Sequence, residues 1–223
     1  MIRAVIFDFN GILADDDPIH MQALQKVAGE DGVTVTEDEY MESYLPLNDR
    51  DCFQELWRKN QRTLKQGELD ELIRRKGVYY FNSIEQKTVL FEGAADAVRA
   101  AAARGPVAVA SGARMGEIRY ILGKAGLLDC FSTIVAMEDV RRGKPDPEPF
   151  SLAFARLRES LTGLVPEECA AVEDSLGGIQ SAHSAGISCL GVAHSYPRIR
   201  LEREKPKWVI DSISDFSEWL NRV

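Results

Sequence analysis

A small set of polar side chains in this chain has the types and the spacing needed for metal and phosphate chemistry. Carboxylate oxygens suit a hard divalent cation, and a hydroxyl and an ammonium group suit phosphate oxygens. The residues are Asp8 and Asn10 after the largely apolar stretch 2–7, Ser111 after the stretch 106–110, Glu173 and Asp174 after the stretch 168–172, and Lys144 in the loop 142–146.

Each of these residues also has a simple structural explanation when it is taken alone. Asp8 could cap a turn, Ser111 could be a turn residue, and Lys144 could be a solvated loop lysine. Their order along the chain favours a shared site, because polar residues after parallel strands meet at one edge of the sheet. Asp8 is then a candidate nucleophile or metal ligand.

The elements that must position these residues follow two different patterns. From residue 17 to residue 87 the apolar spacing is that of amphipathic helices, whereas strands and helices alternate after residue 87. This predicts an α/β fold, a doubly wound, Rossmann-like parallel sheet with an inserted α-helical cap. We expect residues 1–16 and 88–223 to form the core domain and residues 17–87 the cap. The expected strands are 2–7, 106–110, 133–137, 168–172, 188–193 and 208–210, and the expected core helices are 93–104, 115–125, 148–161, 179–185 and one near the end.

Composition limits the classes of partner. The chain has 223 residues, a formal net charge of -8 and 45% hydrophobic residues, which is typical of a globular enzyme. An acidic chain is repelled by nucleic acids and anionic membrane surfaces, so neither is expected as a partner. The four cysteines are scattered, which favours reduced thiols over a zinc site or disulfides. We expect a cytoplasmic protein that is a monomer or weak dimer.

Four stretches in order resemble the motifs of the haloacid dehalogenase (HAD) superfamily, in its subgroup with a helical cap. A further stretch, residues 17–20, resembles the cap entry of phosphatases and sugar-phosphate mutases close to β-phosphoglucomutase and of phosphoglycolate-type phosphatases. The resemblance covers nearly the whole chain. The matching motifs are Asp8-Phe9-Asn10-Gly11, Ala110-Ser111-Gly112, Gly143-Lys144-Pro145-Asp146 and Glu173-Asp174-Ser175.

This resemblance implies a reaction and a role for each motif. It implies a Mg²⁺-dependent phosphatase of small phosphorylated metabolites, in which Asp8 attacks phosphorus and forms an aspartyl-phosphate. The implied metal ligands are Asp8, the backbone carbonyl of Asn10, Asp174 and, nearby or through water, Glu173. The residues implied to hold the phosphoryl group are Ser111, Gly112 and Lys144.

Asn10 departs from the family pattern. Phosphatases and mutases of the family have an Asp there, which protonates the leaving group and then activates water. An amide cannot do this, and loss of such a group typically costs ~10²–10⁴-fold in rate. Three explanations are open: Asn10 replaces a native Asp and slows turnover, a cap residue such as His20 or one of residues 15–17 supplies the proton, or the leaving group needs none.

The cap offers candidates for binding the non-reacting end of the substrate. These are His20, Arg50 and the segment 74–76, of which Lys76 is the principal one. A structural hydrogen bond is the alternative for His20, and a solvated helix face is the alternative for the basic residues. We interpret His183 and His194 as structural.

Two other functions are alternatives to the phosphatase. A hexose-phosphate mutase similar to β-phosphoglucomutase needs efficient acid-base catalysis, so Asn10 weighs against it. The other is a catalytically impaired protein that binds a phosphorylated metabolite. The intact pair Glu173 and Asp174 disfavours a metal-free dehalogenase, and the absence of lysine from residues 44–50 disfavours a phosphonoacetaldehyde hydrolase.

Overall fold

The computed structural model describes residues 1–45, 47–87 and 89–223, which form two compact units. One unit, the core, consists of Met1–Asp15 and Leu90–Val223, and the other, the cap, consists of Asp16–Val89. The expected boundary at residue 88 lies outside the described residues. Among the described residues, no helix has both the length and the apolar character needed to cross a bilayer.

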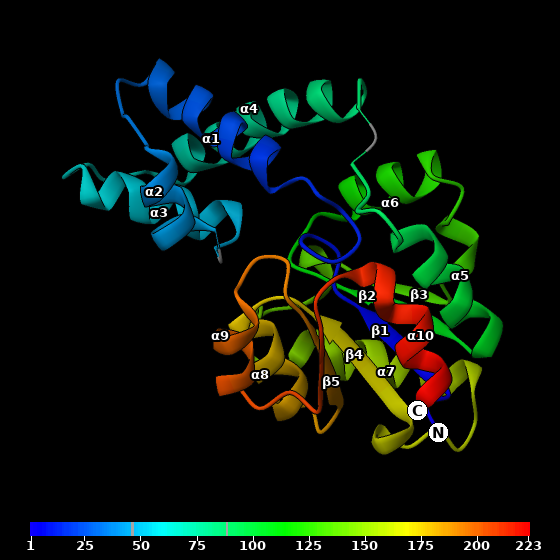
Figure 1. Ribbon diagram of the computed structural model, residues 1–223. Helices are drawn as coiled ribbons and strands as arrows, with labels where there is room; N and C mark the ends of the chain where they lie inside the picture. Colours follow the sequence, from blue (N-terminus) through cyan, green and yellow to red (C-terminus); the bar gives the residue numbers. More distant parts are fainter. Residues whose placement is uncertain (46, 88) are drawn as a thin grey trace. The chain divides into compact units, whose positions relative to one another are not determined.

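The core is a six-stranded sheet in the order β3-β2-β1-β4-β5-β6, and all its neighbouring strands are parallel (Figure 1). The predicted doubly wound α/β fold is therefore confirmed. Chain order reverses between β1 and β4, so β1 lies at the centre, where open α/β sheets place their ligands. The strands are β1 (Ala4–Phe7), β2 (Val107–Ala110), β3 (Thr133–Val135), β4 (Cys169–Glu173), β5 (Ser188–Val192) and β6 (Trp208–Ile210).

Alternating side chains of the buried strands pack on helices at the two faces of the sheet. Ile6 of β1 belongs to an apolar cluster that also contains Phe150 and Ile179 from the helices α7 and α8. The next residue, Phe7, faces the opposite way and packs on Phe216, with ring centroids 5.2 Å apart. The core helices are α5 (Ala94–Arg104), α6 (Met115–Lys124), α7 (Glu148–Ser160), α8 (Leu176–Ser184), α9 (Arg198–Arg203) and α10 (Phe216–Arg222).

The cap has an apolar core of its own, built from α1 (Asp17–Glu30), α3 (Asp49–Lys59) and α4 (Gln66–Ile84). Local capping sets where its shorter helices begin. Thr36 forms a capping box with Glu39 at the start of α2 (Glu37–Glu39), which continues into a π-helical turn, Tyr40–Tyr44. The Asn48 side chain accepts a hydrogen bond from the Asp51 backbone at the start of α3.

Two helices differ from the sequence prediction. α8 begins at Leu176 instead of residue 179, because Ser175 caps it by accepting a hydrogen bond from the Gly178 backbone (3.0 Å). The short helix α9 was not predicted. It has six residues, of which only Leu201 is buried, so its sequence has almost no amphipathic signal.

Candidate active site

Asp8 lies immediately after the central strand. The pairing of Phe7 with Val172 in β4 places Asp8 beside Glu173, and the Asp8 backbone N–H donates to the Val172 carbonyl (2.9 Å). Asp8 is 9% exposed. The sheet therefore fixes the backbone of Asp8 at the edge where a ligand can reach its carboxylate.

A compact turn follows Asp8 and brings its backbone against a second carboxylate. The Phe9 carbonyl accepts hydrogen bonds from the backbones of Leu13 and Ala14, and the Gly11 N–H donates to the Ala14 carbonyl (2.9 Å). Gly11 has φ +76°, and a Cβ built on it would lie 2.0 Å from Oδ2 of Asp174. Glycine is required here, because any side chain would occupy the position of that carboxylate.

Glu173 is fully buried, and both of its oxygens accept hydrogen bonds. Oε2 accepts from the backbones of Asp174 and Ser175 (both 3.1 Å) and from the Ser175 hydroxyl (2.9 Å), whereas Oε1 contacts the Lys144 ammonium. A Cβ on Gly178 would lie 1.8 Å from the Glu173 carboxyl carbon, so α8 packs directly against this group. Glu173 is thus arranged to hold the lysine and the β4–α8 turn.

Lys144 pairs with two carboxylates at once. Its Nζ lies 2.8 Å from Oδ1 of Asp8, contacts Glu173, and lies 4.9 Å from the centre of the Phe150 ring. Burial alone would lower the pKa of Lys144, but the two adjacent carboxylates outweigh it and raise that pKa. Lys144 is therefore a fixed positive charge beside Asp8.

The electrostatic balance at Asp8 favours proton uptake when no cation is bound. Burial, followed by the negative charge of Glu173, raises the pKa of Asp8 from 3.8 to about 7, although Lys144 opposes the shift. Asp8, Glu173 and Asp174 each offer a carboxylate oxygen, and these oxygens lie within 4.8 Å of one another. Such a cluster of oxygens is suited to a hard divalent cation, whose charge would favour ionised Asp8.

The structure thus brings four of the predicted site residues into one cluster: Asp8, Lys144, Glu173 and Asp174. Ser111 directly follows β2, and its Oγ accepts a hydrogen bond from the Ala113 backbone (3.1 Å). It is buried, and Gly112 follows it in the turn that leads to α6. Asn10 lies in the turn after Asp8, where a backbone bridge pairs it with Ala14.

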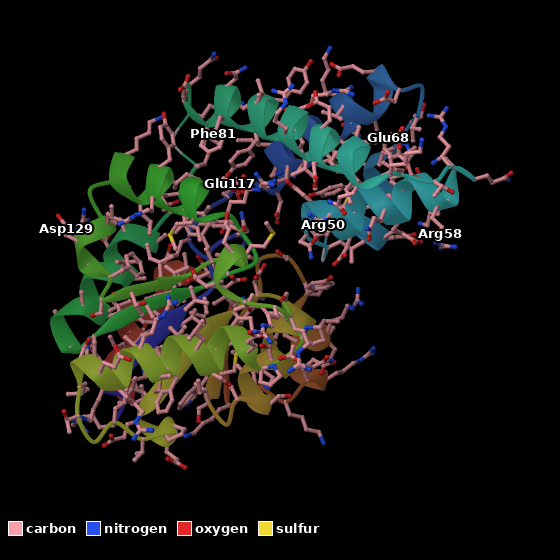
Figure 2. All side chains as sticks on the ribbon, turned by 180° about the vertical axis from the view of Figure 1, so that it is seen from behind. Arg50, Arg58, Glu68, Phe81, Glu117 and Asp129 are labelled. Atoms are coloured by element: carbon pink, nitrogen blue, oxygen red, sulfur yellow. The ribbon has the colours of Figure 1, made fainter. Side chains whose placement is uncertain are left out.

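The candidate residues of the cap fall into two groups within that unit. Lys76 is 5% exposed, and its Nζ contacts Nδ1 of His20 (2.9 Å) and the Asp49 carboxylate. Arg50 lies at the start of α3 (Figure 2) and is about half exposed. Its guanidinium lies 3.6 Å from the Asp70 carboxylate. Lys76 and His20 therefore lie together, whereas Arg50 takes part in a surface ion pair.

The segment 74–76 does not form one basic surface. Arg74 pairs with Glu71 on the exposed side of α4, and Arg75 pairs with Glu30 and Asp31. Only Lys76 of these three residues is buried. The alternative of a solvated helix face thus applies to Arg74, whereas Lys76 takes part in a buried polar cluster.

Two further polar residues lie at this edge of the sheet: Ser195, which the sequence did not single out, and His194, which we expected to be structural. His194 and Ser195 follow β5, and they contact the Gly11 carbonyl and the Asp174 carboxylate respectively. The signal that found the other residues, polar side chains after a buried strand, is present here as well. The hydrogen bonds of His194 with the Gly11 carbonyl and the Ile213 backbone agree with the expected structural role.

A comparison with protein families identifies the class that this fold and site define. Residues 2–186 match the haloacid dehalogenase-like hydrolase family, so the chain belongs to that family and is a hydrolase of the phosphatase type. It is 29% identical over 191 residues to fructose-1-phosphate phosphatase YqaB of Escherichia coli K12, covering 84% of this chain and 95% of the relative.

Two solved structures are similar to the chain over nearly its full length. One is a mutant of CbbY from Rhodobacter sphaeroides in complex with xylulose-(1,5)bisphosphate, with 25% identity, a TM-score of 0.84 and 96% of each chain covered. The other is β-phosphoglucomutase from Clostridium difficile, with 21% identity, a TM-score of 0.86 and 100% and 96% coverage. The second similarity shows the shared fold.

Proposed function

We propose that this protein is a Mg²⁺-dependent phosphatase of small phosphorylated metabolites that acts through an aspartyl-phosphate on Asp8. The observation that carries the proposal is the cluster of Asp8, Glu173 and Asp174, with oxygens within 4.8 Å, and the Lys144 ammonium 2.8 Å from Asp8. The relatives named above act on or bind sugar phosphates, which favours phosphorylated sugars as the substrate class.

The donor set fits Mg²⁺, because carboxylate oxygens are the ligands that this ion prefers. Asp8, Asp174 and the backbone carbonyl of Asn10 would hold it, and Glu173 would take part nearby or through water. When bound, the ion would neutralise negative charge on the phosphoryl oxygens and on Asp8. Glu173 already accepts four hydrogen bonds in the structure, so we assign its principal role to positioning Lys144.

The residues of the chain would carry out the reaction in two steps. A carboxylate oxygen of Asp8 attacks phosphorus as the ester P–O bond breaks, and the leaving oxygen takes a proton from a water molecule. Water then attacks the phosphorus of the aspartyl-phosphate, which regenerates Asp8 and releases inorganic phosphate. Lys144, Ser111 and the backbone of Gly112 would hold the phosphoryl oxygens, and Lys144 would offset the repulsion between Asp8 and an anionic substrate.

Asn10 leaves both proton transfers without the carboxyl group that the family uses. We propose that Asn10 slows this protein's turnover of ordinary phosphate esters and leaves substrate binding intact. An activated leaving group, as in an acyl phosphate, needs no proton and would still be released. A protein that only binds a phosphorylated metabolite is the second candidate, and Asn10 is the observation that favours it.

Phosphate release from a panel of sugar phosphates and an acyl phosphate, with Mg²⁺ or with EDTA, tests this proposal. The matched variants are Asn10→Asp, which restores a carboxyl, and Asp8→Ala, which removes the nucleophile. We expect Mg²⁺-dependent release that rises in Asn10→Asp and is abolished in Asp8→Ala. Release from Asp8→Ala at the original rate would refute the assignment. Tight binding of an ester without release by the protein and by Asn10→Asp would favour the binding function.

Substrate recognition by His20, Arg50 and Lys76 remains a prediction. Lys76 and His20 lie together in a buried cluster with Asp49, so a substrate group that reached one of them would also meet the other. Replacing Lys76 by Met should raise the KM for a sugar phosphate more than for an acyl phosphate. Equal effects on the two substrates would contradict the assignment.

We also propose that the protein works in the cytoplasm as a monomer or weak dimer. All four cysteines are free thiols in the structure, as expected in a reducing compartment. The large apolar residues that are exposed, such as Met41, Val165 and Ile199, come from separate parts of the chain. Light scattering on the purified protein measures the oligomeric state, and a stable higher oligomer would contradict this part of the proposal.

A further inference from the structure

The loop after β5 contacts two segments of the proposed cation site through consecutive residues. Nδ1 of His194 lies 2.7 Å from the carbonyl oxygen of Gly11, in the turn after Asp8. The hydroxyl of Ser195 donates a hydrogen bond to Oδ2 of Asp174. One dipeptide therefore connects the turn after β1 with the carboxylate after β4.

The hydrogen bonds of His194 define which of its nitrogens carries the proton. The Ile213 backbone N–H lies 3.2 Å from Nε2, so this nitrogen is the acceptor. Nδ1 of the neutral ring then carries the proton and donates it to the Gly11 carbonyl. The ring also stacks on Phe91 at 4.2 Å between centroids, and the Phe91 backbone bonds to the Leu13 carbonyl. His194 is thus held on three sides around the turn after Asp8.

Ser195 donates its hydrogen bond to the carboxylate of Asp174, which has little space to move. Oδ2 of Asp174 lies 2.0 Å from the position that a Cβ of Gly11 would take, so the carboxylate packs against the backbone that His194 holds. A carboxylate has about four lone-pair positions, so a hydroxyl on Oδ2 is compatible with a cation on the same group. The hydroxyl therefore selects one orientation of Asp174.

We propose that His194 and Ser195 are positioning residues for the divalent cation, and this inference rests on the proposed Mg²⁺-dependent function. Ser195 holds the Asp174 carboxylate in the orientation that faces Asp8. His194 holds the Gly11 carbonyl and, with it, the adjoining backbone of Asn10. Groups that orient metal ligands in this way typically contribute 10–100-fold to metal affinity or activity, as an order of magnitude.

Direct binding of Mg²⁺, measured by calorimetry in the absence of substrate, tests the role of Ser195. In Ser195→Ala we expect the dissociation constant to rise about 10–100-fold, whereas Ser195→Thr, which keeps the hydroxyl, should restore most of the affinity. Ser184→Ala is the matched control, because Ser184 is exposed at the end of α8. Urea unfolding of each variant with EDTA gives its stability. Unchanged Mg²⁺ affinity in Ser195→Ala would overturn the inference.

Two substitutions separate the two hydrogen bonds of His194. His194→Asn keeps a donor near the position of Nδ1, facing Gly11, and loses the acceptor for Ile213. His194→Gln can keep an acceptor for Ile213 and loses the donor to Gly11. We expect the Asn variant to bind Mg²⁺ close to the original affinity and the Gln variant to bind it about tenfold or more weakly. Equal affinities in the two variants would show that His194 acts only in folding and would overturn its assignment.

The same measurements distinguish this inference from the proposed function. If the unsubstituted protein binds no divalent cation, the proposed function fails, and the inference fails with it. If it binds Mg²⁺ and Ser195→Ala binds equally well, only the inference fails. Weaker binding in Ser195→Ala, rescue in Ser195→Thr and unchanged folding of both variants would support the role of Ser195.

Discussion

Replacing Lys144 by Met would remove the positive charge that the structure places among three carboxylates. Lys144 contacts Asp8 and Glu173, and Asp174 belongs to the same cluster. Met has a similar length and can keep the packing on Phe150. The substitution therefore tests the charge and the hydrogen bonds of Lys144 more than its volume.

The expected loss of stability is several kcal/mol. At 2.8 Å from Asp8, the ion pair has a gross attraction of about 6 kcal/mol at an effective dielectric constant of ~20. The cost of burying the charges offsets part of this, and breaking a buried ion pair typically costs about 3–5 kcal/mol. The remaining carboxylates would also repel one another, which should raise the pKa of Asp8 further.

Urea unfolding at mildly alkaline pH, with EDTA and then with saturating Mg²⁺, measures this effect. In EDTA we expect Lys144→Met to unfold with about 3–5 kcal/mol less free energy than the unsubstituted protein. Mg²⁺ should make the difference in unfolding free energy between the two proteins smaller, because a bound cation would replace the missing positive charge. A cation that binds only the folded state stabilises that state. Lys124→Met is the control, since Lys124 is exposed on α6.

Two results would refute this reasoning. If Lys144→Met loses no more stability in EDTA than Lys124→Met, the carboxylates do not depend on the lysine charge. If the loss is the same in EDTA and in Mg²⁺, the cation does not bind at the cluster. The second result would remove the basis for a metal site at this edge of the sheet.

Three further predictions use separate measurements. The first concerns pH: in EDTA, the unfolding free energy should fall by up to about 4 kcal/mol, relative to that of Asp8→Asn, as pH rises from about 4 to about 7. The reason is that the folded state binds the proton of Asp8 more tightly than the unfolded chain does. A constant difference between the two proteins across this range would contradict the raised pKa of Asp8. Gly178→Ala should destabilise the protein by about 1–3 kcal/mol and lower kcat, because the Cβ of the alanine would overlap the Glu173 carboxylate. Gly177→Ala should leave kcat unchanged, because the nearest atom to its Cβ would be 4.0 Å away. Equal kcat values in the two variants would refute the role of Gly178. Lys76→Met should lower the thermal midpoint more than Arg74→Ala, because Lys76 is buried with Asp49 and Arg74 is on the surface; equal midpoints would show that the buried pair adds no stability.

The sequence predicted the elements of the fold correctly where a local pattern of residues determined them. Apolar runs predicted each strand of the sheet, and the polar residues after them predicted which side chains share an edge. Patterns failed where a tertiary contact decided the outcome. The start of α8 was predicted three residues late, because Gly177 and Gly178 are weak helix formers and the nearby Glu173 carboxylate requires Gly178.

The roles of individual site residues depend on side-chain directions, which sequence patterns do not contain. Spacing alone could not show that Glu173 turns toward Lys144 and the backbone, or that Lys76 is buried while Arg74 is exposed. His194 and Ser195 follow a strand as Ser111 does, but their partners lie in segments about 180 and 20 residues away in the chain. The contacts of His194 and Ser195 depend on how the strands pair in the sheet.

The most direct test of the central claim is to look for the phosphorylated form of Asp8. The protein is incubated with Mg²⁺ and a phosphoryl donor, either an acyl phosphate or a sugar phosphate, then quenched in acid and measured by intact-protein and peptide mass spectrometry. Because Asn10 cannot activate the water that breaks down the intermediate, we expect a mass gain of one phosphoryl group on the peptide containing Asp8, with no gain in EDTA or in Asp8→Ala. Phosphate release without any phosphorylated Asp8, or the same mass gain in Asp8→Ala, would contradict the account.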